Sequence, residues 1–347
     1  MNSEKILLHS DSQKFLDDLR QGADVLGPTR KGGGTSSYSN PVFAPIQKWE
    51  DLELDYKSSM LSPKKILFPD NQDLYGYEVE KDTVRLENLR AQLNREIILL
   101  GIHPCDIAAI SCLDRLFMHD HFRDEVYSAK RAQVTIIGLT CAEPHEHCFC
   151  NTMGAGPDAD SGYDLLMTDL GDRFLIKAGT EKGVRLLEAG YLKDAGDEDR
   201  RQRAEIIRKV EESLPAKMDL KRITNNLLVK YDDDLWQEFA DVCCSCGACN
   251  MVCPTCHCFA ITDKTNPERT KGRRVLVWDA CHFERFSQIG NKSLRGEKSQ
   301  RYKHRLYDKL LYDPRRHGTI FCVGCGRCAE FCPAHIKLLA VMAKLEE

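Results

Sequence analysis

Residues 243–254 read CCSCGACNMVCP, and residues 322–333 read CVGCGRCAEFCP. Both segments contain four cysteines at the spacing Cys-x2-Cys-x2-Cys-x3-Cys, and a proline follows the fourth cysteine. This run is typical of bacterial proteins that bind two [4Fe–4S] clusters. The two segments therefore predict a pair of [4Fe–4S] clusters in the last third of the chain.

The same pattern predicts which cysteines share a cluster. Three cysteines two residues apart surround one cluster, and the fourth, before the proline, binds the other cluster. The first cluster is thus assigned Cys243, Cys246, Cys249 and Cys332. The second is assigned Cys253, Cys322, Cys325 and Cys328. Zinc is excluded here because zinc knuckles pair two CxxC units into one site, whereas each run has four cysteines and a proline.

Residues 253–257 read CPTCH, which also matches the attachment signature of c-type haem. We exclude haem because Cys253 is already needed by the second cluster. The two runs are separated by 68 residues with mostly helical patterns. This long spacer resembles the α-helical ferredoxin module of succinate dehydrogenase and heterodisulfide reductase subunits. It predicts a mainly α-helical, ferredoxin-like two-cluster domain over residues 233–347.

Residues 1–232 are predicted to form an α+β or α/β domain. A short helix is expected over residues 4–22 and a buried strand over 96–101. A helix capped by Asp106 should follow this strand, and residues 134–139 should form a second strand. Residues 163–170 and 173–178 flank Gly171 and Asp172, which predicts a hairpin. Residues 31–37 read as a Gly-rich loop.

This first domain has cysteines of its own. Cys105 and Cys141 each follow a predicted strand, and Cys148 and Cys150 come shortly afterwards in a loop. If the two strands are neighbours, the four thiols converge at one sheet edge. We predict a third [4Fe–4S] cluster bound by Cys105, Cys141, Cys148 and Cys150. A structural zinc ion and a set of buried free thiols are the alternatives.

Five cysteines remain. Cys112 lies on the apolar side of its predicted helix and is expected in the core, and Cys244 is off the motif spacing. The sequence does not distinguish whether Cys256, Cys258 and Cys281 are cluster ligands or free thiols. They permit a second hypothesis, an Fe–S enzyme with its own site for a thiol or sulfur substrate.

Composition limits the remaining classes of function. No run of 18 apolar residues exists, and the first residues lack the pattern of a secretory signal, so a cytoplasmic protein without a membrane span is expected. In a reducing cytoplasm, 17 cysteines indicate metal binding rather than disulfides. No phosphate-binding loop is present, and residues 154–157 lack the context of a dinucleotide fingerprint, so no flavin or NAD is expected on this chain.

Residues 260–347 carry 18 Lys+Arg and 10 Asp+Glu. This basic region allows a third hypothesis, nucleic-acid binding, which would require salt-dependent affinity. It equally fits an acidic partner subunit or compensation of cluster charge. We expect no nucleic-acid partner, because that hypothesis rests on charge alone.

The chain resembles one family over nearly its whole length: the 4Fe–4S dicluster electron-transfer subunits of anaerobic sulfite reductase and the β subunits of cytosolic sulfhydrogenases. The resemblance rests on segments distributed along the chain. They are residues 104–110 (PCDIAAI) with Leu113 and Asp114, Cys148-Phe149-Cys150 followed by Gly154, residues 253–259 (CPTCHCF), Trp278 with Cys281, and residues 322–328 (CVGCGRC).

The resemblance implies a non-catalytic electron-transfer subunit in a hetero-oligomer. Its partners would be a flavin-containing NAD(P)H oxidoreductase subunit together with a catalytic reductase or hydrogenase subunit. Sulfite reductase, sulfhydrogenase and heterodisulfide reductase complexes all fit this description, and the terminal acceptor stays open.

Overall fold

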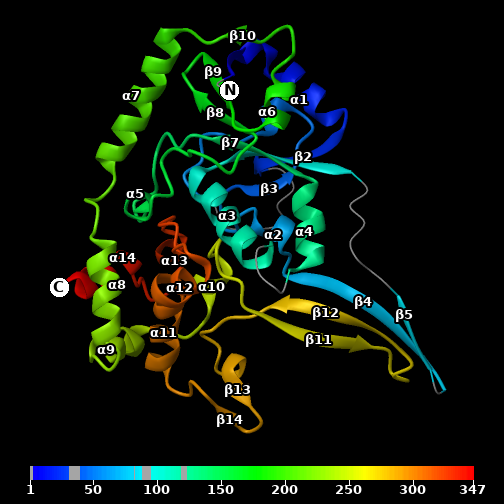
Figure 1. The fold of residues 1–347 in the computed structure, drawn as a ribbon, viewed down its shortest axis with the longest axis vertical. Helices are drawn as coiled ribbons and strands as arrows, with labels where there is room; N and C mark the ends of the chain where they lie inside the picture. The colour runs from blue at the N-terminus through cyan, green and yellow to red at the C-terminus, as the bar shows by residue number, and fades with distance from the viewer. Residues whose placement is uncertain (1–2, 31–39, 82, 88–94, 119–122) are drawn as a thin grey trace.

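The computed structural model describes residues 3–30, 40–81, 83–87, 95–118 and 123–347 (Figure 1). The strands are β1 Glu4–Leu8, β2 Ala23–Thr29, β3 Val42–Pro45, β4 Asn71–Glu80, β5 Thr83–Glu87, β6 Glu96–Ile102, β7 Val134–Leu139, β8 Leu165–Asp169, β9 Arg173–Ala178, β10 Lys193–Asp194, β11 Phe259–Thr265, β12 Lys271–Trp278, β13 Gln288–Ile289 and β14 Lys292–Ser293. The α-helices are α1 Ser12–Arg20, α2 Lys64–Leu67, α3 Pro104–Met118, α4 Glu125–Ala132, α5 Cys150–Met153, α6 Glu181–Leu186, α7 Asp197–Ser213, α8 Leu220–Val229, α9 Leu235–Val242, α10 Ala248–Met251, α11 Lys298–Tyr307, α12 Asp313–His317, α13 Arg327–Glu330 and α14 Leu338–Glu346. Short 3-10 turns are η1 His9–Asp11, η2 Trp49–Asp51 and η3 Glu284–Ser287, and η4 Asp308–Tyr312 is a π-helical turn.

The main sheet has the strand order β10-β1-β9-β8-β7-β6-β2-β3. Its centre, from β8 to β2, is parallel, and antiparallel strands flank it. Successive residues of β6 enter cores on opposite faces: Leu100 packs in the core under α1, and Leu99 packs in the core under α3. This burial on both faces explains why β6 and β7 are continuous apolar runs.

The strands expected at residues 96–101 and 134–139 are confirmed as β6 and β7, and they are parallel neighbours. The expected hairpin is confirmed as β8 and β9. The helix expected over residues 4–22 is wrong in its first part, because residues 4–8 form β1 between β9 and β10. The Gly-rich segment at residues 31–37 lies outside the described residues.

A second sheet joins the two halves of the chain. Strand β12 pairs with β11 on one side and with β4 on the other, so its order is β11-β12-β4-β5. The long strands extend away from the main sheet at one end of the molecule (Figure 1). Residues 233–347 therefore contain strands as well as helices, and strand pairing crosses the boundary predicted between residues 232 and 233.

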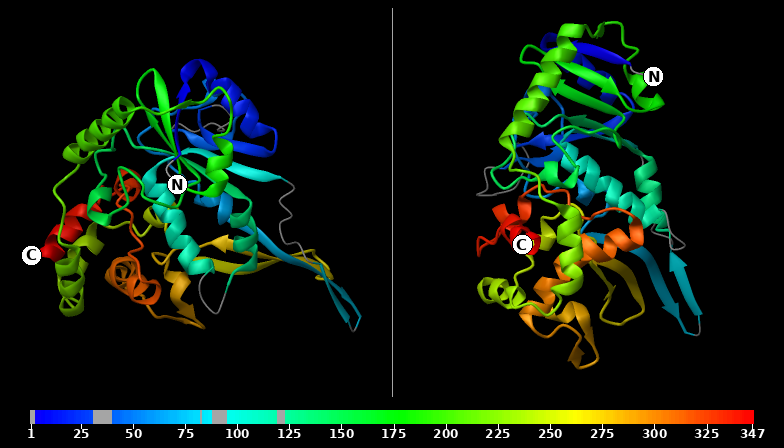
Figure 2. Two further views of the ribbon diagram at one scale, coloured as in Figure 1. Left: turned by 45° about the horizontal axis from the view of Figure 1, so that its top comes forward. Right: turned by 60° about the vertical axis from the view of Figure 1, so that its left-hand side comes forward.

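Helix α7 runs from the main sheet toward α8 and α9, which pack beside α11 and α14 (Figure 2). These helices share an apolar core that includes Trp236, Tyr307 and Met342. The chain thus has mixed α/β content, with the two cysteine runs next to this helical core. In the described part of the chain, no helix combines the length and the apolar character that a membrane crossing needs.

Candidate metal centres

The two cysteine runs fold in the same way. In each run the second cysteine is followed by a glycine with a positive φ, Gly247 at 73° and Gly326 at 71°. A short helix then carries the third cysteine: α10 holds Cys249 and α13 holds Cys328. Helices α10 and α13 pack against each other. Two segments 68 residues apart in sequence are therefore placed face to face.

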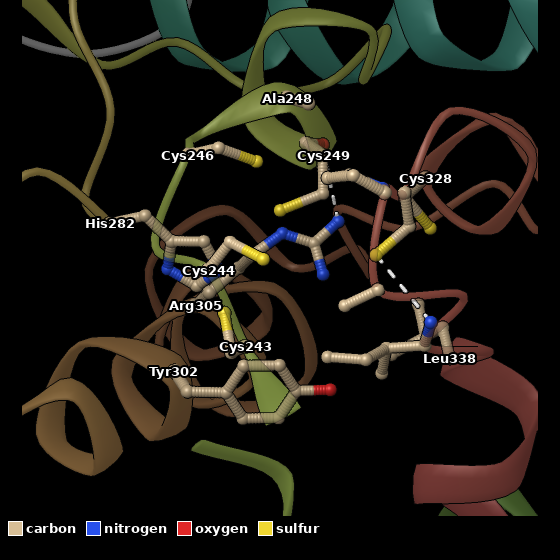
Figure 3. Close-up of a pocket in the computed structure, with 14 residues that line it drawn as sticks. Cys243, Cys244, Cys246, Ala248, Cys249, His282, Tyr302, Arg305, Cys328 and Leu338 are labelled. Carbon is tan, nitrogen blue, oxygen red and sulfur yellow. Dashed lines mark hydrogen bonds between the residues drawn. The ribbon is translucent and has the colours of Figure 1, made fainter. Parts of the chain in front are cut away.

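The first predicted ligand set lines one cavity. Cys243, Cys246 and Cys249 line it together with Cys332 of the other run. Cys328 lines it as well, and Arg305 and Tyr302 of α11 complete the wall (Figure 3). The structure thus brings the fourth cysteine of the second run to the first three predicted ligands of the first run.

The second predicted set is also gathered in space. Burial raises the pKa of Cys322 to about 11, with Lys309 opposing the rise and the Cys328 and Cys253 thiols adding to it. Burial likewise raises the pKa of Cys325, and Cys253 is again among the contributing neighbours.

A threonine connects Cys253 to the other run. The Thr255 hydroxyl lies 3.3 Å from Cys253 Sγ and donates a hydrogen bond to the carbonyl oxygen of Phe321. Phe321 directly precedes Cys322, so this bridge places the Cys253 segment beside the start of the second run.

The third predicted set lines a second cavity. Cys105 is the second residue of α3, which follows β6, and Cys141 follows β7. The parallel pairing of these strands therefore places both thiols at one edge of the sheet. Cys148 and Cys150 line the same cavity. Burial raises the pKa of Cys141 to about 12, and the Cys148 and Cys150 thiols add to the rise, which indicates that these thiols are close together.

The third cavity touches the second run directly. Cys325 is part of its lining. The Cys148 thiol lies 3.6 Å from the carbonyl oxygen of Cys325, and the Phe149 backbone N–H donates to the carbonyl oxygen of Gly324 at 2.8 Å. The cysteine sets of the two chain halves are therefore adjacent.

A buried ion pair holds this junction. Arg327 is 1% exposed and binds both carboxylate oxygens of Asp106, at 2.9 and 2.8 Å. Its Nε also donates to the carbonyl oxygen of Ser59. Asp106 was expected to cap α3, and this expectation is wrong: it lies within the first turn of α3 and pairs with the second cysteine run instead.

Three further cations are buried among the cysteines. Lys64, Arg305 and Lys309 are 3%, 4% and 5% exposed. Their hydrogen bonds go to neutral oxygen atoms, such as the carbonyl oxygens of Cys253 and Cys256 for Lys64 and that of Cys249 for Arg305. Within the described residues, none of the three has a carboxylate in ion-pair contact, and Arg305 Nε has no hydrogen-bond partner.

Burying a charged lysine or arginine side chain costs free energy unless a negatively charged group lies nearby. Burial works to lower the pKa of Arg305, but Cys249, Cys328 and the other surrounding thiols raise it well above its ordinary value. Clusters bound by four thiolates supply such negative charge. The donor atoms and the buried cations together fit [4Fe–4S] clusters. No sequence pattern marks these cations, because a buried lysine or arginine looks the same in sequence as a surface one.

The remaining cysteines form a separate group. Asn250 Nδ2 donates to Cys281 Sγ at 3.1 Å and to Cys256 Sγ at 3.7 Å. The pKa of Cys281 is lowered to about 7, chiefly because Cys258 hydrogen-bonds to it. Cys112 is buried in the core, as expected, and Cys244 is exposed.

Comparison with known proteins agrees with this geometry. The model of a family described as a 4Fe-4S dicluster domain matches residues 242–336, which contain both runs. Sulfhydrogenase 2 subunit beta of Pyrococcus furiosus is 29% identical over 346 residues, covering 99% of this chain and 98% of the relative. No solved structure matches. The chain is therefore an iron–sulfur protein with a 4Fe–4S dicluster domain, similar along nearly its whole length to a sulfhydrogenase β subunit.

Proposed function

We propose that the chain is a non-catalytic electron-transfer subunit with three [4Fe–4S] clusters. The first would be held by Cys243, Cys246, Cys249 and Cys332. The second would be held by Cys253, Cys322, Cys325 and Cys328, and the third by Cys105, Cys141, Cys148 and Cys150. When bound, each such cluster accepts and releases one electron at a potential that depends on charge, hydrogen bonding and exposure.

One observation carries this proposal: the second cysteine set lies between the other two. Cys328 lines the cavity of the first set, and Cys325 lines the cavity of the third set. The three sets therefore form a row, not three isolated sites. Because the rate of electron transfer falls steeply with the distance between redox centres, a row of adjacent centres suits a relay.

The spacing of the thiols supports clusters rather than zinc. Tetrahedral zinc with Zn–S bonds of about 2.3 Å requires sulfur atoms about 4 Å apart. Among the described residues, which include all the cysteines, no three cysteine Sγ atoms lie within 4.8 Å of one another. The wider spacing favours a larger group such as a cubane at all three sites.

The relay would connect two partner subunits in a hetero-oligomer. We infer a flavin-containing NAD(P)H oxidoreductase subunit on one side and a catalytic reductase or hydrogenase subunit on the other, as the family resemblance implies. Cys246 of the first site is exposed, and Val242, which directly precedes Cys243, is 57% exposed. This exposed part of the first site offers a surface on which a partner can bring its own redox centre close.

The test is anaerobic and optical. Nicotinamides deliver a hydride, which is a two-electron package, and flavins can divide it into single electrons. NADH or NADPH added to the flavin-free chain should leave the visible cluster absorbance unchanged. Bleaching should follow only when the co-purifying flavoprotein subunit is added. Bleaching by nicotinamide alone would contradict the relay and indicate a nucleotide site on this chain.

A second candidate function is an Fe–S enzyme with a thiol or sulfur substrate site at Cys256, Cys258 and Cys281. The contact between Cys258 and Cys281 favours it, because the lowered pKa of Cys281 makes a thiolate accessible near neutral pH. In that case a sulfur substrate should change the EPR spectrum of the isolated chain. If no sulfur substrate changes the EPR spectrum, electron relay remains the proposed function.

A further inference from the structure

A group of metal-binding side chains lies outside the three cysteine sites. It consists of His257, Asp308 and Asp313, whose potential ligand atoms all lie within 4.8 Å of one another. His257 stands between Cys256 and Cys258, and the two aspartates come from η4 and the start of α12. We propose that these three residues bind one divalent metal ion of the Zn²⁺ type.

The π-helical turn explains how the two aspartates meet. Asp308 and Asp313 are five residues apart, and on a regular α-helix they would point roughly 140° away from each other. Here the Asp313 backbone N–H donates to the Asp308 carbonyl oxygen, which is the i→i+5 bond of a π-helix. This widened turn places the two carboxylates on the same side. Single π-turns occur frequently at functional sites.

Asp313 is a buried carboxyl group without a sufficient partner. It is 2% exposed, and its Oδ2 accepts no hydrogen bond. The cation in ion-pair contact is Arg316, whose Nη1 is 3.8 Å from Asp308 and 4.0 Å from Asp313, and the Arg316 side chain is 63% exposed. Buried Lys309 is directed elsewhere, toward Thr255 and the Phe321 carbonyl. A divalent cation would satisfy both carboxylates.

One ring nitrogen of His257 is engaged by the backbone, which leaves the other free to bind a metal ion. Its Nδ1 is 3.2 Å from the carbonyl oxygen of Thr255. A carbonyl can only accept, so in the neutral ring that makes this bond Nδ1 carries the proton and Nε2 keeps a lone pair. Such a second hydrogen bond fixes the tautomer and the ring orientation of metal-bound histidines.

The donor set indicates the class of metal. One imidazole nitrogen with two carboxylates suits borderline divalent ions, and three protein ligands leave a position for water, as in open zinc sites. Without a thiolate, the group does not suit Cu(I) or an iron–sulfur cluster. The ion would tie residues 255–257 to η4 and α12, close to Cys253.

The experiment uses the anaerobic holoprotein after brief treatment with a chelator. Zn²⁺ binding is measured by equilibrium dialysis, with zinc and iron determined together. We expect about one zinc per chain at unchanged iron content in the wild type. The same is expected for Asp169→Asn, a control that alters an exposed aspartate 3.7 Å from His9. His257→Gln and Asp313→Asn should each weaken zinc binding at least tenfold while iron stays constant.

His257→Gln and Asp313→Asn distinguish zinc bound at this site from zinc bound to cysteine thiols. Both retain every cysteine, so zinc bound to thiols would persist in them, and equal binding in wild type and variants would overturn the proposal. Absence of zinc binding in the wild type would overturn it too. His257 is only half-buried, so its substitution leaves the test valid if Asp313→Asn does not fold.

Discussion

At the scale of single residues, the structure contains buried charged side chains that the cysteine motifs do not predict. The cysteine ligands can be proposed from spacing alone, because the intervals between the cysteines are typical of [4Fe–4S] clusters. Arg327 and Asp106 could not be paired in this way. They are 221 residues apart, and the pair forms only because the loop after β6 meets the second cysteine run. Local sequence patterns cannot predict a contact between segments this far apart in the chain.

Arg327→Met is expected to lower the free energy of unfolding by about 3–5 kcal/mol, because it leaves Asp106 buried without its partner. Anaerobic unfolding of the holoprotein measures this loss. Arg201→Met is the matched control, since Arg201 is 75% exposed and its ion pair should contribute less than about 1 kcal/mol. The double variant Arg327→Met/Asp106→Leu should recover part of the stability. Equal stability of Arg327→Met and the control would contradict a structural role for the pair.

Cys253→Ser is expected to perturb the second cluster rather than the first. The reason is the exchange of the fourth cysteine, supported by the proximity of Cys253 to Cys322 and Cys325. EPR spectra of the reduced protein should change in the same way in Cys253→Ser and Cys325→Ser. Cys246→Ser, a ligand variant of the first cluster, should change a different signal. A Cys253→Ser spectrum that matches Cys246→Ser would refute the assignment.

At the scale of elements, sequence patterns identified what local chemistry decides. Strands β6 and β7 were predictable because both are continuous apolar runs, and the β8–β9 hairpin because Gly171 marks its turn. The pattern of residues 4–22 predicts helix where β1 forms, because Glu4–Leu8 is short and its conformation depends on pairing with β9. The joining of β12 to β4 was not foreseen either, since these strands are far apart in sequence.

The loop of the second run depends on a glycine. Gly324 has φ +64°, and a Cβ there would lie 2.6 Å from the backbone of Phe149. Gly324→Ala should therefore lower stability by strain of about 1–3 kcal/mol plus the cost of separating this loop from the third site. Unfolding midpoints and iron content measure the effect.

Gly290→Ala is the matched control for this substitution. Gly290 has a similar φ of +59°, but a Cβ there would meet nothing within 4 Å. The control should lose only the backbone strain and keep all its iron. If both variants behave alike, close contact between the second run and the third site is not important for stability.

At the scale of the whole molecule, the three cysteine sets form one row that crosses the two halves of the chain. The second sheet, the Arg327–Asp106 pair and the contact between Cys148 and Cys325 all join these halves. The convergence of Cys105, Cys141, Cys148 and Cys150 was predictable once β6 and β7 were taken as neighbours. Their position beside the second run was not, because it depends on how the halves pack.

The central claim is that each of the three cysteine sets holds a [4Fe–4S] cluster, and anaerobic analysis of iron and acid-labile sulfide tests it most directly. The wild type should contain about twelve irons and about twelve sulfides per chain, since each cubane contributes four of each. Cys150→Ser should contain about eight irons. One zinc in addition to twelve irons would agree with this account. A wild type with about eight irons, equal to the Cys150→Ser variant, would contradict the third cluster and leave only the two clusters of the dicluster domain.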